Sequence, residues 1–215
     1  MKSSLHLPLL GLIALGAAGL TGCLSLQPVA DPVRYFRLEP LAESVESGPP
    51  PAAPLAVGIA QVQIPAYLQS RALAVIKTEA PHEISYHTYL QWSEPLDGAV
   101  TEVLGANLAA QLQTSRIFTH GWYTQQVDYE LYVELERFDL DEQGQVRLEA
   151  RWRITRPGGR EVVRFGHAII THTAAPPLQH PEQAVAGLSQ ALAELSRRVA
   201  DDLRKLNASK PTAAR

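Results

Sequence analysis

Alternation of apolar and polar residues is clearest in the middle of the chain, where it predicts two long neighbouring strands. A period of two places apolar side chains on one face of a strand and polar side chains on the other. The alternating apolar positions are Tyr129, Leu131, Val133 and Leu135 in the first run, and Val146, Leu148, Ala150, Trp152 and Ile154 in the second. The segment from Asp141 to Gln145 contains Gly144 and can close a hairpin between them. Pro157-Gly158-Gly159 then predicts a turn into a further strand at 161–171.

The polar faces of the two long strands carry opposite charges and are expected to face solvent. Acidic residues dominate the first strand and arginines the second: Glu130, Glu134 and Glu136 against Arg147, Arg151 and Arg153. Opposite charges across a strand pair contribute a few tenths to about 1 kcal/mol each. We therefore predict the register that sets Glu136 opposite Arg151 and Glu134 opposite Arg153.

Helical spacing of apolar residues predicts two helices. The first begins near Ser93-Glu94-Pro95, because proline suits the opening turn of a helix. Its apolar positions are Leu96, Val100, Val103, Leu104, Leu108 and Leu112. The second begins near Pro181, and its apolar stripe consists of Val185, Leu188, Leu192, Leu195, Val199 and Leu206. Residues from Asn207 onward are expected to form a disordered tail.

Shorter apolar runs precede the first helix and predict strands at 34–38, 55–64, 72–78 and 83–89. The proline-rich segment 43–54 is expected to be an exposed loop, and Pro65-Ala66-Tyr67-Leu68 interrupts the chain between two strands. Strands and helices in this order predict an α+β fold with a mixed, largely antiparallel sheet. Two main helices, including a long C-terminal helix, are expected to pack on that sheet.

The N-terminal segment has the pattern of an export signal. Lys2 is followed by an apolar run from Leu5 to Leu20, which glycines and Pro8 make unsuitable as a membrane span. Leu20-Thr21-Gly22-Cys23 resembles the lipobox of bacterial lipoproteins, and Cys23 is the only cysteine in the chain. We expect cleavage after Gly22 and lipidation of Cys23, as an S-diacylglycerol and N-acyl cysteine.

This interpretation divides the chain into a signal peptide (1–22), a lipidated tether (23–33), a single domain (34–206) and a tail (207–215). In bacteria that resemble the familiar enterobacterial case, Asp after the lipidated cysteine retains a lipoprotein at the inner membrane. Leu24 occupies that position here. The outer membrane, facing the periplasm, is therefore expected, with the periplasmic face of the inner membrane as the alternative.

Composition and motifs favour a folded protein without enzymatic chemistry. Hydrophobic residues make up 46% of the chain and charged residues 19%, while the net charge of −3 argues against nucleic acid as a partner. A single cysteine excludes an internal disulfide and a thiolate metal cluster. The histidine pairs 82/87 and 167/172 are five residues apart, which places their members on opposite faces of a strand. No catalytic residue, metal or cofactor is predicted.

The three tryptophans are expected to serve mainly as anchors of the fold. Trp152 lies on the apolar face of its strand, which predicts a core position. Trp122 is predicted to be a core or half-buried anchor. For Trp92, packing and surface contact are equal alternatives.

Three segments together resemble a known family. They are Ile64-Pro65-Ala66-Tyr67-Leu68, Tyr89-Leu90-Gln91-Trp92-Ser93-Glu94-Pro95-Leu96, and Leu148-Glu149-Ala150-Arg151-Trp152. In this order after a lipobox they are similar to the PqiC/YmbA lipoproteins, which are called ABC-type transport auxiliary lipoproteins. The resemblance extends from the lipobox through the last helix. It implies no catalytic residues, and the motif positions are candidates for fold or for docking: Pro65, Tyr67, Leu68, Trp92, Glu94, Pro95 and Leu96.

The resemblance also implies a function. Family members are associated with MCE-protein systems that move lipids or other hydrophobic molecules between the inner and outer membranes. The leading hypothesis is a non-enzymatic subunit that is held by outer-membrane lipid through Cys23 and docks an MCE-domain protein. A periplasmic lipid carrier and a structural envelope-assembly lipoprotein are the alternatives. Association with further copies of the chain is left open.

Overall fold

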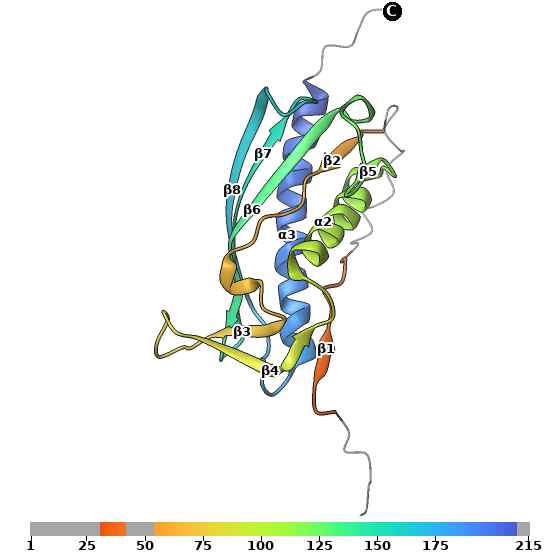
Figure 1. Ribbon diagram of the computed structural model, residues 1–215. Coiled ribbons are helices and arrows are strands. Elements are labelled where there is room, and N and C mark those ends of the chain that lie inside the picture. The colour runs from red at the N-terminus through yellow and green to blue at the C-terminus, as the bar shows by residue number, and fades with distance from the viewer. Residues whose placement is uncertain (1–30, 42–53, 210–215) are drawn as a thin grey trace, which may run out of the picture. The chain divides into compact units, whose positions relative to one another are not determined.

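A computed structural model of the chain describes residues 31–41 and 54–209 (Figure 1). The chain divides into two compact units, Met1–Pro32 and Val33–Arg215. Cys23 and the predicted signal peptide lie outside the described residues, as do most of the predicted tether, most of the 43–54 loop and residues 210–215. The helices and strands considered below all belong to the second unit.

The described residues of this unit form eight strands, two α-helices and two short 3₁₀ helices. In chain order these are β1 (Arg34–Phe36), β2 (Val57–Ile59), η1 (Ala66–Leu68), β3 (Ala72–Ile76), β4 (Ile84–Trp92), α2 (Leu96–Leu112), β5 (Ile117–Phe118), η2 (Thr124–Gln126), β6 (Tyr129–Asp141), β7 (Gln145–Thr155), β8 (Val162–Thr173) and α3 (Pro181–Ala208).

The sheet is built around an antiparallel meander of β6, β7 and β8. The other edge of β6 pairs in parallel with β2 near its start and with β3 near its end. β4 is antiparallel to β3, β1 is parallel to β4, and β5 is parallel to β2. The prediction of a mixed, mostly antiparallel sheet is therefore confirmed, although β5 was not anticipated.

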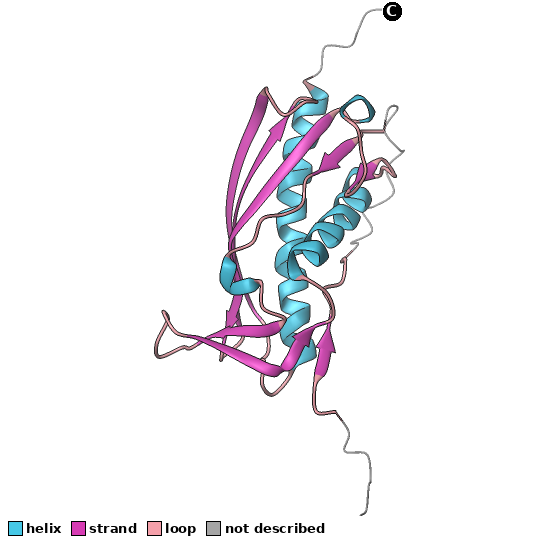
Figure 2. Ribbon diagram, viewed as in Figure 1, coloured by secondary structure: helices cyan, strands magenta, loops and turns pink. Residues whose placement is uncertain are grey.

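Both helices lie on one side of the sheet (Figure 2). The side chains that fill the space between the layers include Phe138, Leu148, Leu188 and Leu192, each at most 2% exposed. This arrangement confirms the α+β class and the long C-terminal helix. The predicted starts of both helices agree with the structure, since Pro95 caps α2 and Pro181 opens α3.

The helix α3 continues to Ala208, two residues beyond the predicted end of the domain at residue 206. The carbonyl of Leu206 accepts a hydrogen bond from the Tyr129 hydroxyl at 3.3 Å, and the Leu206 side chain packs against the core. These contacts hold the last helical turn against the sheet. The start of the tail at Asn207 was therefore predicted too early.

The predicted register between β6 and β7 was wrong. Arg151 lies opposite Glu134 and Arg153 lies opposite Tyr132, two residues away from the predicted pairing, and a β-bulge between Leu135 and Arg137 adds one residue to β6. The pairing of Glu134 with Arg153 does not occur. Arg151 nevertheless forms an ion pair with Glu136, the extra residue of the bulge.

The polar face of β6 is also less exposed than predicted. Glu130 is 3% exposed, and its carboxylate accepts hydrogen bonds from the Gly158 backbone N–H at 2.7 Å and from the Tyr132 hydroxyl at 3.0 Å. Asp139, near the other end of β6, is 2% exposed. Turns that are distant in sequence therefore cover both ends of this face, which a two-residue periodicity does not reveal.

The single strand predicted at 55–64 is shorter in the structure. Regular pairing is limited to β2, and the chain rejoins β6 only at an isolated bridge between Gln63 and Glu134. Trp152 lies in the core, as predicted, and Trp92 is also a core residue at 5% exposure. Packing is therefore the role of Trp92 in the fold. Trp122 lies against Gly58 and is half-buried.

Candidate functional site

The first family motif forms η1 and its cap. Pro65 precedes the helix, and its carbonyl accepts a hydrogen bond from the Leu68 N–H at 3.0 Å. Leu68 is 4% exposed and belongs to the core. The Tyr67 hydroxyl donates a 2.6 Å hydrogen bond to Asp139 Oδ2 on β6. The motif therefore attaches a turn to the sheet at the point where the chain passes from β2 to β3.

The Asp139 carboxylate is the centre of this attachment. Arg137 donates to it from Nη2 at 2.8 Å and from Nε at 3.2 Å, so that the buried charge is neutralised. Burial raises the pKa of the Tyr67 phenol well above its ordinary value, and the hydrogen bond to Asp139 raises it further. Tyr67 therefore stays protonated and acts as a hydrogen-bond donor, with no role in proton transfer near neutral pH.

The second motif forms the junction between β4 and α2. Leu96 is 3% exposed and packs in the same core as Trp92, and the Pro95 carbonyl accepts the first helical hydrogen bond from the Ala99 N–H at 3.1 Å. Glu94 is exposed between these buried residues. Among the residues of these two motifs, Glu94 presents its charge to solvent, whereas Leu68, Trp92 and Leu96 are buried and pack in the core. Whether any motif residue contacts a partner stays a prediction.

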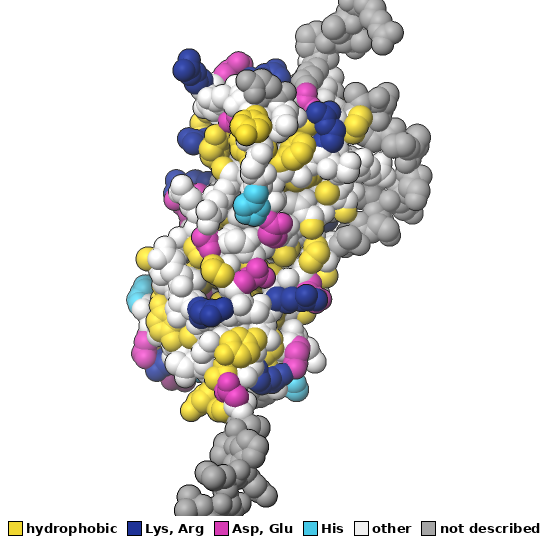
Figure 3. Space-filling model, turned by 45° about the vertical axis from the view of Figure 1, so that its right-hand side comes forward, with side chains coloured by type: hydrophobic (Ala, Val, Ile, Leu, Met, Phe, Trp, Pro, Cys, Tyr) yellow, Lys and Arg dark blue, Asp and Glu magenta, His cyan; other side chains and the backbone are white. Residues whose placement is uncertain are grey.

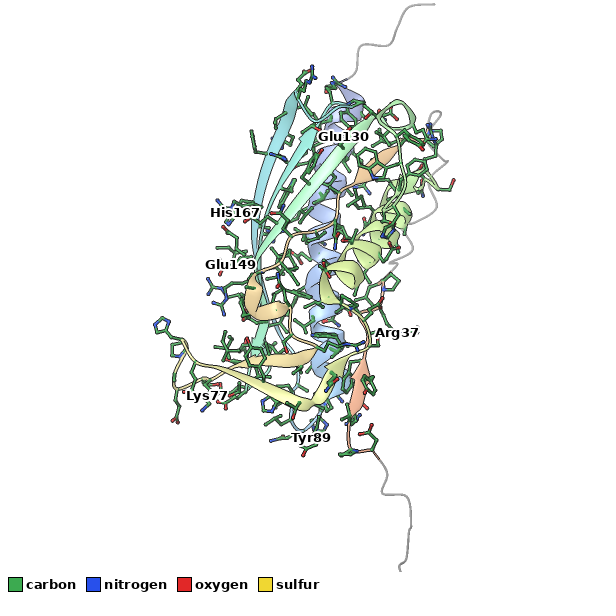
Figure 4. The ribbon with its side chains drawn as sticks, in the orientation of Figure 1. Arg37, Lys77, Tyr89, Glu130, Glu149 and His167 are labelled. Atoms are coloured by element: carbon green, nitrogen blue, oxygen red, sulfur yellow. The ribbon has the colours of Figure 1, made fainter. Side chains whose placement is uncertain are left out.

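A different surface has the features of a contact site: the face of β6, β7 and β8 that points away from the helices. We call it the open face and define it by Tyr132, Glu134, Arg151, Arg153, Phe165, His167 and Ile169. Side chains of this face project on the side opposite α2 and α3, as His167 and Glu149 show in Figure 4.

The open face is organised in rows across the three strands. In one row Tyr132, Arg153 and Phe165 occupy directly opposite positions. The Arg153 guanidinium lies 4.4 Å from the centroid of the Tyr132 ring, a cation–π distance. Phe165 is 71% exposed, although β-strand pairing holds its backbone in place. The adjacent row consists of Glu134, Arg151 and His167.

A groove of about 670 Å³ crosses this surface, between the 60–63 segment and the side chains of β6–β8. Tyr132, Arg153 and Phe165 all line it. In the described parts of the chain, no carboxylate forms an ion pair with Arg153, whereas Arg151 is paired with Glu136. The groove thus offers one unneutralised cation between two aromatic rings, which suits binding of a carboxylate next to an apolar group.

Sequence reasoning predicted the strand at 161–171 but did not single out its outward apolar residues. The available signal was that Phe165 and Ile169 occupy the same face as His167, where polar residues would be expected. Among the residues that the structure describes, no cluster of His, Cys, Asp and Glu has an arrangement that could hold a metal ion. The open face instead presents exposed aromatic and apolar side chains beside Arg153.

A model of the family described as "ABC-type transport auxiliary lipoprotein component" matches residues 36–200. The chain belongs to this family. The resemblance to the PqiC/YmbA lipoproteins is thereby confirmed. The comparison with curated proteins found no match.

Solved structures show the fold of this auxiliary lipoprotein. A Xanthomonas campestris protein of the DUF330 family has 14% sequence identity and a TM-score of 0.62, covering 82% of this chain and 99% of that chain. A crystal structure of an uncharacterized protein has 19% identity and a TM-score of 0.61, covering 79% of this chain and 97% of the other. At these identities the similarity establishes the fold alone.

Family membership makes the chain an auxiliary component of an ABC-type transport system, and this is not an enzyme class. As a lipoprotein family, it also indicates a membrane-anchored protein that faces the periplasm. Within residues 31–41 and 54–209, neither α-helix is long and apolar enough to cross a membrane.

Proposed function

We propose that the protein is a non-enzymatic outer-membrane lipoprotein subunit of an MCE-type intermembrane transport system. Lipid on Cys23 anchors it, residues 23–33 form the tether, and the domain at 34–206 docks the periplasmic MCE component. The open face supports this proposal most directly, because it combines exposed aromatic and apolar side chains with an unneutralised arginine on a rigid sheet.

The composition of the open face is typical of the centre of a protein interface. Aromatic residues and arginine are enriched there, because they bury a large area and lose little conformational freedom. Phe165 is 71% exposed and Ile169 is 49% exposed in the isolated chain. Covering these side chains would remove apolar surface from water, whereas the opposite face of the sheet is already covered by α2 and α3.

The same surface indicates the chemistry of the partner. A partner carboxylate placed beside an apolar side chain would pair with Arg153 and pack on Phe165 at the same time. Glu134 and Glu136, in the neighbouring positions, disfavour a strongly acidic partner surface. We therefore expect a mixed apolar and weakly acidic patch on the MCE-domain protein.

The lipid-carrier hypothesis gains no support from the interior of the domain. The space between sheet and helices is occupied by core side chains, and the groove described above is open at the surface. Location at the outer membrane is part of the proposal and depends on Leu24 in the position after Cys23. The third alternative, an envelope-assembly lipoprotein, differs from the proposed subunit in its partners.

Affinity purification from cross-linked envelopes tests the proposal. The unmodified lipoprotein should recover an MCE-domain protein, and the double variant Phe165→Ser/Arg153→Ser should reduce recovery by tenfold or more, on the order expected for loss of two central interface residues. Tyr123→Ser is the matched control, because Tyr123 is also exposed, at 70%, but lies outside the open face.

Repeated recovery of unrelated envelope proteins alone would overturn the MCE assignment. Recovery of the MCE protein at an unchanged level by the double variant would overturn the assignment of the open face. The exposure of Phe165 and Arg153 makes misfolding an improbable cause of lost binding, and circular dichroism and the thermal midpoint of each variant check this directly.

A further inference from the structure

A second group of exposed aromatic and apolar residues lies at one end of the domain. Tyr35 on β1 is 58% exposed, Tyr89 on β4 is 62% exposed, and Leu178 in the loop before α3 is 58% exposed. Tyr89 projects from the end of the molecule opposite the C-terminus of α3 (Figure 4), and the loop between β8 and α3 lies at the same end (Figure 1). We call this group the tyrosine end.

The two tyrosines lie on the exposed face of β1 and β4. Tyr35 lies opposite Gln91 in the parallel β1–β4 pair, and Tyr89 precedes Gln91 by two residues, so both tyrosines occupy one face. The other face of β4 carries Leu90 and Trp92 into the core. Tyr35 therefore cannot turn inward without breaking the pairing of β1 with β4.

The covalent connection limits how far this end can lie from the predicted anchor. Val33 follows Cys23 by ten positions and is followed directly by β1, so a fully extended tether spans at most about 35 Å. The 28 residues of α3, by contrast, extend about 42 Å from this end to the other. A lipid on Cys23 therefore restrains the tyrosine end to the neighbourhood of the membrane more closely than any other part of the domain.

Charge at this end is largely compensated. Arg34 forms an ion pair with Glu182 of α3, and Arg37 lies 3.3 Å from the Glu39 carboxylate. Hydrophobic and charged side chains are interspersed on this part of the surface (Figure 3). Attraction to anionic lipid is consequently weak, and amphipathic tyrosine side chains, which favour the layer of lipid headgroups, supply the main affinity.

We propose that the tyrosine end lies in the headgroup layer of the membrane that holds Cys23, with Tyr35 and Tyr89 as interfacial contacts. This inference rests on the lipid attachment that is part of the proposed function. The contact directs α3 away from the membrane and leaves the open face in the aqueous compartment, where a periplasmic partner can reach it.

Fluorescence quenching on the lipidated protein tests this orientation. Acylated Cys23 has no free thiol, so Tyr89→Cys or Tyr123→Cys supplies a single labelling position for an environment-sensitive fluorophore. Tyr123 is the matched control, because it is 70% exposed and lies in the loop after β5, away from β1 and β4. The protein is incorporated into vesicles of phosphatidylethanolamine with a minority of phosphatidylglycerol.

The label at position 89 should be quenched by nitroxide-bearing lipid and shielded from aqueous iodide, and the label at position 123 should show the reverse. Equal access of iodide to both labels would overturn the proposal. Mass spectrometry of the N-terminal peptide establishes independently whether Cys23 is acylated. Loss of MCE recovery with continued shielding of position 89 would refute the proposed partner and leave the membrane contact intact.

The unlipidated variant Cys23→Ser provides a second measurement with the same vesicles. Adding Tyr35→Ser and Tyr89→Ser should lower the fraction of Cys23→Ser protein in the vesicle pellet on the order of tenfold. The reason is that two aromatic side chains that enter the headgroup layer are lost. Tyr123→Ser should leave the partition unchanged, and added salt should have little effect. Equal partition of the double-tyrosine variant and its parent, or loss of binding in salt, would contradict an aromatic contact.

Discussion

Replacing Gly166 by alanine should destabilise the domain through a single steric conflict. Gly166 on β8 lies directly against Trp152 of β7, and an added Cβ would approach the indole atoms Cε2, Cζ2 and Nε1 more closely than the 3.0 Å that real Cβ atoms keep. Trp152 is 6% exposed, so the indole cannot move into solvent. It also donates from Nε1 to Asp202 Oδ2 on α3 at 3.2 Å.

The magnitude follows from these two contacts. Overpacking of a buried site costs about 1–3 kcal/mol. Displacing the indole also weakens a hydrogen bond to a buried carboxylate, which is worth about 1.5–3 kcal/mol when the acceptor is charged. Asp202 retains its ion pair with Arg164 at 2.9 Å, which limits the second loss. We therefore expect Gly166→Ala to lower the free energy of unfolding by about 2–4 kcal/mol.

Urea unfolding followed by tryptophan fluorescence and circular dichroism measures this change. Trp152→Phe removes the indole nitrogen and part of the ring system, so Gly166→Ala should cost at least about 1.5 kcal/mol less in that background. Gly98→Ala in α2 is the control: no heavy atom lies within 4 Å of the added Cβ. It should be neutral or stabilise by up to about 1 kcal/mol. Equal costs of Gly166→Ala in both backgrounds would refute the steric argument.

Three further outcomes are expected. Tyr67→Phe removes the hydrogen bond to Asp139 and should lower the free energy of unfolding by about 1–3 kcal/mol in urea titrations; an unchanged midpoint would show that η1 is held by other contacts. Arg198 donates a hydrogen bond to the Glu194 carboxylate and keeps its pKa below the ordinary value. The resulting stabilisation is present above the ordinary glutamate pKa and is lost as the pH falls through the lowered pKa of Glu194. The thermal midpoint of Glu194→Gln should therefore fall less on acidification than that of the unmodified protein. Cys23→Ser should move most of the protein from the membrane pellet to the soluble fraction, and sedimentation at the level of the unmodified protein would contradict lipid anchoring.

The sequence determined the class of fold and the order of its elements. A period of two identified β6 and β7, and apolar stripes with proline at the first turn located α2 and α3, because these signals depend on residues that are close in sequence. The motif around Pro65 and Tyr67, together with that around Trp92, was sufficient to indicate the family. The lipid attachment at Cys23 is likewise a property of local sequence and remains a prediction.

Only the tertiary structure decided the register, the burial of charges and the surfaces available for contact. A β-bulge at Glu136 adds one residue to β6, and the observed pairing of β6 with β7 differs from the register that the charges alone favoured. Asp139 is buried because a turn more than seventy residues earlier in the chain packs over it. Phe165 and Tyr89 look like ordinary strand residues in the sequence. Phe165 is exposed because α2 and α3 both cover the other side of the sheet (Figure 2). Tyr89 is exposed because it lies on the face of β4 opposite the buried Leu90 and Trp92.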